Sequence, residues 1–329
     1  MSPQLPAHVP SRAPAIIITC VIGPIVSTAI VSIRVWTRVV VTRNLGWDDY
    51  AAMVTLLFCI GFSVVLGIST RYGMGLHLWD MTPELVSDHS EWIYISSALY
   101  LVSILGYRIA LLLMYLRLFG VSTPFRYATW AVMCFVTGYL FCNIITLIFG
   151  CTPIDKYWKP AESGHCINLV QADHAYGSMN VVSDLLLFLL PLPMVWQLNL
   201  SAREKLGLFL VFMGGIGNCV VTTVRFALLV QNLNAPDKPW LDARTFLLTV
   251  VEINTGLICG CTPVLKPFFR HLFSTPPPDQ SQQPFTPRSD SIWMGHFPED
   301  RTRSNYRDFI ELERGKDASD DSSVLEDVG

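Results

Sequence analysis

Seven long apolar stretches follow one another along this chain, and they limit what it can fold into. They cover residues 15–33, 50–70, 92–116, 127–154, 175–200, 206–233 and 245–265. About 20 apolar residues are enough for a helix to cross a lipid bilayer. A soluble domain of this size would not place seven such runs in series. The sequence therefore predicts an all-α fold, a bundle of seven transmembrane helices whose surroundings are a lipid bilayer.

The composition agrees with a membrane protein. Apolar residues make up 51 % of the chain and charged residues 15 %, whereas about 25 % of the residues of a soluble domain are charged. The formal net charge of −3 gives no indication of a nucleic-acid partner. The spans and their loops use the chain up to about residue 270, so a second folded domain is not expected.

Three segments are predicted along the chain. Residues 1–14 form a short extracytosolic N-terminus, and residues 15–271 form the seven-helix domain. Residues 272–329 form a polar and acidic cytosolic tail, which has too few apolar residues to order itself. The first segment lacks the basic start and small-residue cleavage site of a signal peptide, so the first span is expected to direct insertion.

The distribution of Lys and Arg near the span ends favours one orientation, because cytosolic loops carry the excess of these residues. With the N-terminus outside and the C-terminus in the cytosol, the cytosolic segments hold Arg34, Arg38, Arg43, Arg117, Arg126, Arg203, Lys205, Lys266 and Arg270. The outer segments then hold Arg12, Arg71, Lys156, Lys159, Lys238 and Arg244. The membrane itself, plasma membrane or endoplasmic reticulum, is left open.

Four spans contain a single ionisable residue each, and these are the first candidates for function. They are Arg108, Asp184, Arg225 and Glu252. A lone charge at the centre of a bilayer costs at least about 2.5 kcal/mol, so such residues normally face the interior of a bundle and are paired.

The expected depth of each charge predicts its partner. Arg225 and Glu252 lie toward the outer side, and Asp184 lies near the middle of its span. These depths predict that Arg225 pairs with Glu252, or is shared between Glu252 and Asp184. The pairs either lock the helix packing, form a polar pocket for a small molecule, or act as an acid and a base.

Arg108 is expected deeper, toward the cytosolic end of the third span. Asp48 and Asp49, at the start of the second span, are therefore candidates for its partner.

The outer gap after the second span has a Gly-Met-Gly-Leu run followed by His77, which is typical of a tight turn that presents a histidine. The gap also contains several carboxylates, but no pair of metal ligands one helical turn apart. We expect a solvated acidic loop and predict no metal site; His77 remains a candidate for ligand binding.

Two of the nine cysteines, Cys151 and Cys166, fall in the outer gap after the fourth span. Both are on the oxidising side in the favoured orientation, so a disulfide between them is one expectation. It would stabilise the loop by roughly 3 kcal/mol in the chain-entropy picture.

A series of short motifs runs through the spans in order. They are Gly46-Trp47-Asp48-Asp49, Gly73 to His77, Tyr115 with Arg117, Cys151-Thr152-Pro153, Cys166, Asp184 to Pro193, Arg225, Glu252 with Asn254, and Cys261-Thr262-Pro263. This series resembles the fungal rhodopsin-domain integral membrane proteins, also called the SAT4 family, which are related to the Pth11-like receptors. The resemblance covers about residues 15–270.

The resemblance implies a receptor-like protein or one associated with a secondary-metabolite gene cluster. It also makes a heterotrimeric G protein a candidate partner, and it marks Trp47, Asp48, Asp49 and Arg117 as a cytosolic motif. Arg108 stands where the family commonly has a lysine. The last span has no mid-membrane lysine for a retinal Schiff base, and no nucleotide, haem or metal motif is present, so no cofactor is predicted.

Two hypotheses of different classes follow. The first is a receptor-like or accessory protein that binds a small lipophilic molecule in a polar pocket within the bundle. The second is a cofactor-free intramembrane enzyme, a cyclase, isomerase or hydrolase, with Asp184 or Glu252 as the acid or base.

Overall fold

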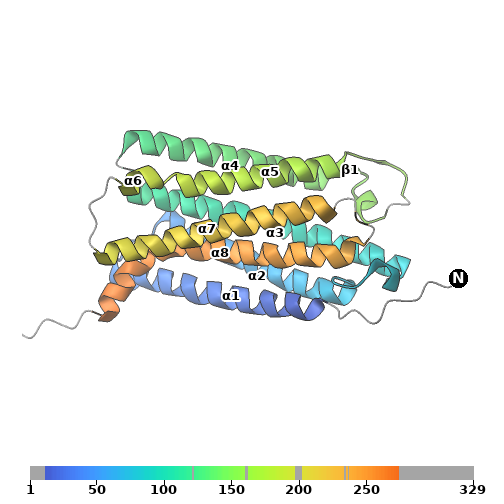
Figure 1. Ribbon diagram of the computed structural model, residues 1–329, viewed down its shortest axis with the longest axis horizontal. Coiled ribbons are helices and arrows are strands. Elements are labelled where there is room, and N and C mark those ends of the chain that lie inside the picture. The colour runs from blue at the N-terminus through green and yellow to red at the C-terminus, as the bar shows by residue number, and fades with distance from the viewer. Residues whose placement is uncertain are drawn as a thin grey trace, which may run out of the picture. The chain divides into compact units, whose positions relative to one another are not determined.

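The computed structural model describes residues 12–120, 122–159, 162–196, 202–232, 235 and 237–273. Seven of its helices are long and apolar enough to cross a membrane (Figure 1). They are α1 (Ala13–Trp36), α2 (Trp47–Ser69), α3 (Pro83–Phe119), α4 (Thr123–Phe149), α5 (Leu169–Leu189), α7 (Ala202–Asn232) and α8 (Lys238–Phe273). The predicted all-α bundle of seven spans is confirmed.

Shorter elements connect these helices. They are the π-helical turn η1 (Thr37–Val41), the 3-10 turns η2 (Thr70–Tyr72), η3 (Leu78–Asp80) and η4 (Ile154–Tyr157), the short helix α6 (Leu192–Trp196), and the strands β1 (Cys151–Thr152) and β2 (His165–Cys166). The tail was predicted to begin at residue 272, but α8 continues to Phe273. The rest of the predicted tail and residues 1–11 lie outside the described residues.

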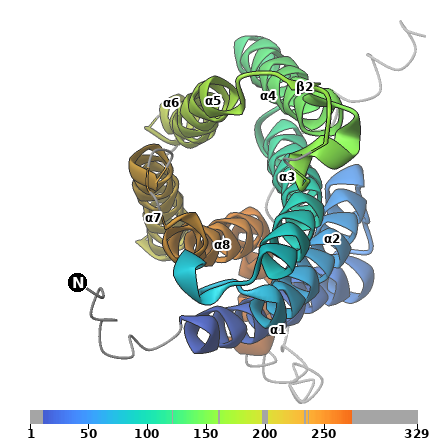
Figure 2. The same cartoon turned by 90° about the vertical axis from the view of Figure 1, so that its right-hand side faces the viewer.

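Successive long helices alternate in direction, and Figure 2 shows them around a common axis. α3 packs against α2, α4 and α8, and α7 packs against α5 and α8. The start of α1 and the loops after α2 and α4 lie at one end, which we call the disulfide end. The start of α2 and the end of α3 lie at the other, which we call the Asp48 end.

The described bundle has apolar side chains outside and many polar side chains inside. Leu57 is 69 % exposed and Ile25 is 62 % exposed, whereas Ser63, Asn180 and Glu252 are buried. This arrangement suits a lipid environment, where outward side chains contact acyl chains and polar groups must find partners within the protein. The direction in which the bundle crosses the membrane stays a prediction.

Local signals set several helix boundaries. The side chain of Thr82 accepts a hydrogen bond from the Leu85 backbone N–H (3.3 Å) and so caps α3. The side chain of Asn168 caps α5 in the same way, accepting from the Gln171 N–H (3.1 Å). Pro191, which cannot donate a backbone hydrogen bond, follows the end of α5.

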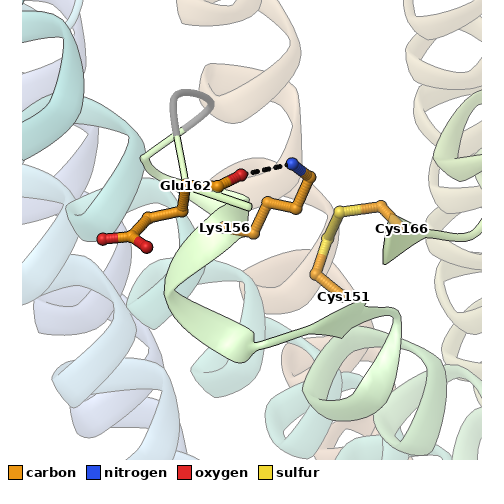
Figure 3. The surroundings of a disulfide bond; sticks show 4 residues. All are labelled: Cys151, Lys156, Glu162 and Cys166. Carbon is orange, nitrogen blue, oxygen red and sulfur yellow. Dashed lines mark hydrogen bonds between the residues drawn. A yellow bond between two sulfur atoms is a disulfide. The ribbon is translucent and has the colours of Figure 1, made fainter. Parts of the chain in front are cut away.

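The disulfide end carries a small antiparallel hairpin formed by β1 and β2, and a disulfide joins Cys151 to Cys166 across it (Figure 3). The expected disulfide is therefore confirmed. Inside the hairpin loop, the Lys156 ammonium donates to the Glu162 backbone carbonyl (2.6 Å). The loop is thus closed by a covalent bond at its base and by a hydrogen bond nearer its tip.

Candidate functional site

Arg108 on α3 is the centre of a polar network inside the bundle. Its side chain is 0 % exposed. The acceptors of its guanidinium come from α3, α4 and α5: Asp184 Oδ1 (2.6 Å), Asn180 Oδ1 (2.6 Å), Ser183 Oγ (2.5 Å), and the hydroxyls of Tyr107 (3.2 Å) and Tyr139. A guanidinium has five N–H donors, so Arg108 has an acceptor for each of them.

Asp184 is equally well satisfied. Its second oxygen, Oδ2, accepts from the Thr222 hydroxyl (2.6 Å) and from the Asn218 amide (3.3 Å), both on α7. The Arg108–Asp184 pair therefore ties α3, α4, α5 and α7 together. With every donor and acceptor occupied, it has the character of a packing element.

A second ion pair joins α7 to α8. Arg225 Nε lies 2.7 Å from Glu252 Oε2, which confirms the pairing expected from depth. The Asn180 amide links the two pairs, because its Oδ1 accepts from Arg108 and its Nδ2 donates to Glu252 Oε1 (3.0 Å). The Arg225 guanidinium also lies 5.3 Å from the ring centroid of Tyr100, within cation–π range.

The second pair, unlike the first, has unused hydrogen-bonding capacity. Arg225 Nε and Glu252 Oε2 are close but not aligned as a hydrogen bond. Among the described residues, no hydrogen bond forms to the two terminal nitrogens of Arg225, and its side chain keeps 9 % exposure. Asn218 Oδ1 is also buried without a donor. These free groups can satisfy a polar molecule that enters the bundle.

The structure corrects the prediction for Arg108. Its carboxylate partner is Asp184, and not Asp48 or Asp49. Asp184 in turn is paired with Arg108, and the only ion pair of Arg225 among the described residues is with Glu252. The reason is that both aspartates lie at the start of α2, where Arg34 and Arg117 contact them. Arg108 lies nine residues before Arg117 on α3, or about 13.5 Å farther along the helix.

Those arginines form a separate network at the Asp48 end. Arg34 near the end of α1 contacts both aspartates, with Nη2 2.5 Å from Asp48 Oδ2 and Nε 2.8 Å from Asp49 Oδ1. Its Nη1 donates to the Gly260 carbonyl on α8 (2.6 Å). From α3, Arg117 Nη1 lies 2.9 Å from Asp48 Oδ1. The predicted motif thus connects four helices.

Arg34 and Arg38 are the residues of this network that sequence reasoning missed as site residues. Their signal was two arginines four residues apart at the end of one span, followed by paired aspartates at the start of the next. Trp47, by contrast, is 82 % exposed, and its ring lies 6.2 Å from the ring of Tyr50. The motif therefore combines an outward aromatic residue with two buried carboxylates.

His77 lies at the disulfide end, apart from the four intramembrane charges. Gly73 and Gly75, both with positive φ (97° and 85°), form the predicted turn before it. His77 Nδ1 is 2.6 Å from Asp237 Oδ2. The ring lies between the stacked rings of Trp79 (centroids 4.4 Å apart) and Trp240 (4.8 Å). The contacts fasten the loop to the start of α8.

A groove of about 340 Å³ follows the seam between α5 and α7. Its walls are almost entirely apolar, and include Phe188, Ile216 and Val220. On α7, the groove residues occupy a different face from Asn218 and Arg225, which point into the network.

Comparison with known proteins now identifies the family. The model of the fungal rhodopsin domain matches residues 33–271. The chain belongs to the fungal rhodopsin domain family. This match confirms the resemblance seen in the sequence. All four intramembrane charges and both networks lie within the matched segment.

Several relatives are similar over most of the chain. A SAT4 family membrane protein of Emericella nidulans is 32 % identical over 248 residues, which are 74 % of this chain and 60 % of the relative. The polyenoic acids biosynthesis gene cluster protein Ba17b of Metarhizium anisopliae is 25 % identical over a match that covers 74 % of this chain and 70 % of that relative. The receptor GIN3 of Arthrobotrys oligospora is 25 % identical over a match that covers 80 % of this chain and 64 % of that receptor.

The chain thus spans about 60 % of the length of the SAT4 relative and 64 % of that of receptor GIN3. No solved structure gave a significant match.

Proposed function

We propose that this multi-pass membrane protein is receptor-like, or accessory to a secondary-metabolite pathway, and binds a small lipophilic molecule inside the bundle. The relatives named as a receptor and as a biosynthetic cluster protein support the two versions of this role. The observation that carries the binding is the incomplete hydrogen bonding of Arg225, next to a saturated Arg108–Asp184 pair.

The free groups define what such a molecule would carry. The terminal nitrogens of Arg225 are donors, so they fit a carboxylate or carbonyl oxygen. The ring of Tyr100, 5.3 Å from the Arg225 guanidinium, suits the remaining, lipophilic part. Asn218 Oδ1 is an acceptor and fits a hydroxyl group on the same molecule.

The alternative of an intramembrane enzyme receives less support from the geometry. Asp184 and Glu252 each lie against a guanidinium, 2.6 Å and 2.7 Å away respectively. Both oxygens of Asp184 already accept hydrogen bonds from the protein, so neither is left to contact a substrate. The two carboxylates are therefore arranged as partners of arginines.

Binding can be tested with the purified full-length chain and three probes of equal chain length: dodecanoic acid, methyl dodecanoate and dodecanol. We expect saturable binding of the acid and the ester by wild type, and a loss of at least about tenfold in Arg225→Gln, as expected for a hydrogen bond to a charged group. Arg244→Gln, which removes a charge from α8 away from Glu252, is the matched control. Equal binding of all probes by all variants would refute the assignment of Arg225.

The role in the cell needs a separate measurement. Deletion of the gene, with complementation by wild type or Arg225→Gln, is followed by metabolite profiles and pathway transcripts. A receptor role predicts that transcripts change with the deletion and that Arg225→Gln fails to restore them. Accumulation of one intermediate at constant transcript levels would instead favour the enzyme.

A further inference from the structure

The network at the Asp48 end has more positive than negative charge. It contains three arginines, Arg34, Arg38 and Arg117, and two aspartates, Asp48 and Asp49. One positive charge therefore has no counterpart within the network. Burying or half-burying an uncompensated charge is unfavourable, so an additional anion would stabilise this end of the bundle.

The surplus charge is that of Arg38. The aspartates already accept from Arg34 and Arg117 at 2.5–2.9 Å. Arg38 is farther away, with Nη2 3.7 Å from Asp48 Oδ2 and Nε 3.6 Å from Asp49 Oδ2, which is beyond hydrogen-bond length. Its Nε is buried and has no hydrogen-bond partner.

Arg38 and Arg117 are also the accessible members of the network. Their side chains are 12 % and 24 % exposed, whereas that of Arg34 is 1 % exposed. Arg38 lies in the π-helical turn η1, where α1 ends and the chain bends toward α2. Two arginines that face the same pair of aspartates can thus present donors to an anion from outside without breaking the Arg34 ion pairs.

Exposed aromatic side chains indicate where this end meets the membrane surface. They belong to the residues nearest the Asp48 end on α1, α2 and α4: Trp36 (43 % exposed), Trp47 (82 %), Tyr50 (51 %), Tyr127 (68 %) and Trp130 (49 %). Trp and Tyr collect at the level of the lipid headgroups. Arg38 and Arg117 therefore lie at the depth of the phosphates of one leaflet.

We propose that Arg38 and Arg117 bind the phosphate of an anionic phospholipid headgroup at the Asp48 end. The phosphate accepts hydrogen bonds from the free donors of Arg38 and from the exposed side of Arg117. In the predicted orientation this is the cytosolic leaflet, where anionic lipids are concentrated. A lipid is favoured over a free phosphate because the site lies next to outward apolar residues, such as Val39 and Val40 (49 % and 51 % exposed), that contact its acyl chains.

The test uses the full-length chain in nanodiscs of phosphatidylcholine, alone or with a minor fraction of phosphatidylinositol 4-phosphate. Thermal unfolding and the number of retained lipids, by native mass spectrometry, are measured. We expect the anionic lipid to raise Tm and to be retained, and its apparent affinity to fall about tenfold or more in Arg38→Gln, with partial recovery in Arg38→Lys.

The matched control is Arg43→Gln, an equal charge loss at an exposed residue with no ion pair among the described residues. Retention and Tm of this variant should equal those of wild type. Equal losses in Arg38→Gln and Arg43→Gln would overturn the site in favour of diffuse attraction. Inositol 1,4-bisphosphate and inorganic phosphate, added to neutral discs, form the last arm; a rise in Tm equal to that given by the lipid would overturn the lipid as the source.

Arg38→Gln is suited to this test because it should fold. The aspartates keep their contacts with Arg34 and Arg117, and the network becomes neutral. In neutral discs we therefore expect an unchanged or higher Tm for Arg38→Gln. A lower Tm there, with no dependence on anionic lipid in wild type, would show that Arg38 acts only within the protein.

Discussion

Replacing Asp184 by Asn should leave the Arg108 guanidinium buried without a carboxylate partner. Both side chains are almost inaccessible, 0 % for Arg108 and 2 % for Asp184, so water cannot replace the lost charge. Removing one member of a buried pair costs about 3–5 kcal/mol. For a folded segment of about 250 residues, about 2 °C of Tm is lost per kcal/mol, which gives a decrease of roughly 6–10 °C.

The double variant Arg108→Gln with Asp184→Asn distinguishes an ion pair from simple packing. Both charges are gone in this variant. The Gln and Asn amides that replace them can hydrogen-bond to each other and to Ser183 and Asn180. We expect the double variant to be more stable than Asp184→Asn alone, with a coupling energy of about 2–3 kcal/mol between the two positions.

The assay is thermal unfolding of the purified full-length chain in neutral nanodiscs, with Asp80→Asn as the control because Asp80 is exposed. Two results would refute the reasoning. One is a Tm of Asp184→Asn within error of that of Asp80→Asn. The other is a double variant whose loss is the plain sum of the two single losses.

Three further predictions concern other parts of the chain. Replacing Cys151 and Cys166 by Ser should lower the free energy of unfolding by roughly 3 kcal/mol. The measurement is the Tm of the variant compared with that of wild type, and the difference between them should disappear when wild type is reduced. Burial, with a smaller effect of the Asp173 and Asp242 carboxylates, raises the pKa of Tyr157 to about 12. The stability that this hydroxyl contributes is complete below its ordinary pKa near 10 and is lost as the pH rises toward 12; Tyr157→Phe should remove this component from an alkaline unfolding series. A fluorescent protein that matures only in the cytosol should fluoresce when fused to the C-terminus, and its silence would reverse the predicted orientation.

Sequence reasoning succeeded where the answer depends on length and depth. Seven apolar runs are enough to count the spans, because a helix needs a fixed number of residues to cross a bilayer. Depth along the span also predicted the Arg225–Glu252 pair, since both residues lie at a similar distance from the same side.

Depth was not enough for Arg108. Each residue turns a helix by about 100°, so the direction of a side chain depends on how the whole helix is rotated against its neighbours. The close contact of α8 with α3 contributes to this rotation: a Cβ on Gly256 would lie 2.7 Å from the ring of Tyr107, so only glycine leaves room there. Tyr107 and Arg108 are then placed against α5, and Asp184 becomes the partner.

The sequence also cannot distinguish a charge that holds helices together from a charge that binds something, because both are single ionisable residues in apolar runs. The difference lies in how many of their donors and acceptors the fold already uses. Arg108 and Arg34 contact acceptors on several helices and are almost fully buried, so they leave nothing for a ligand. Arg225 and Arg38 have equal charge but lack aligned partners and remain partly accessible. The same inventory therefore supports a packing role for Arg108 and Arg34, and it is the basis of the binding roles proposed for Arg225 and Arg38.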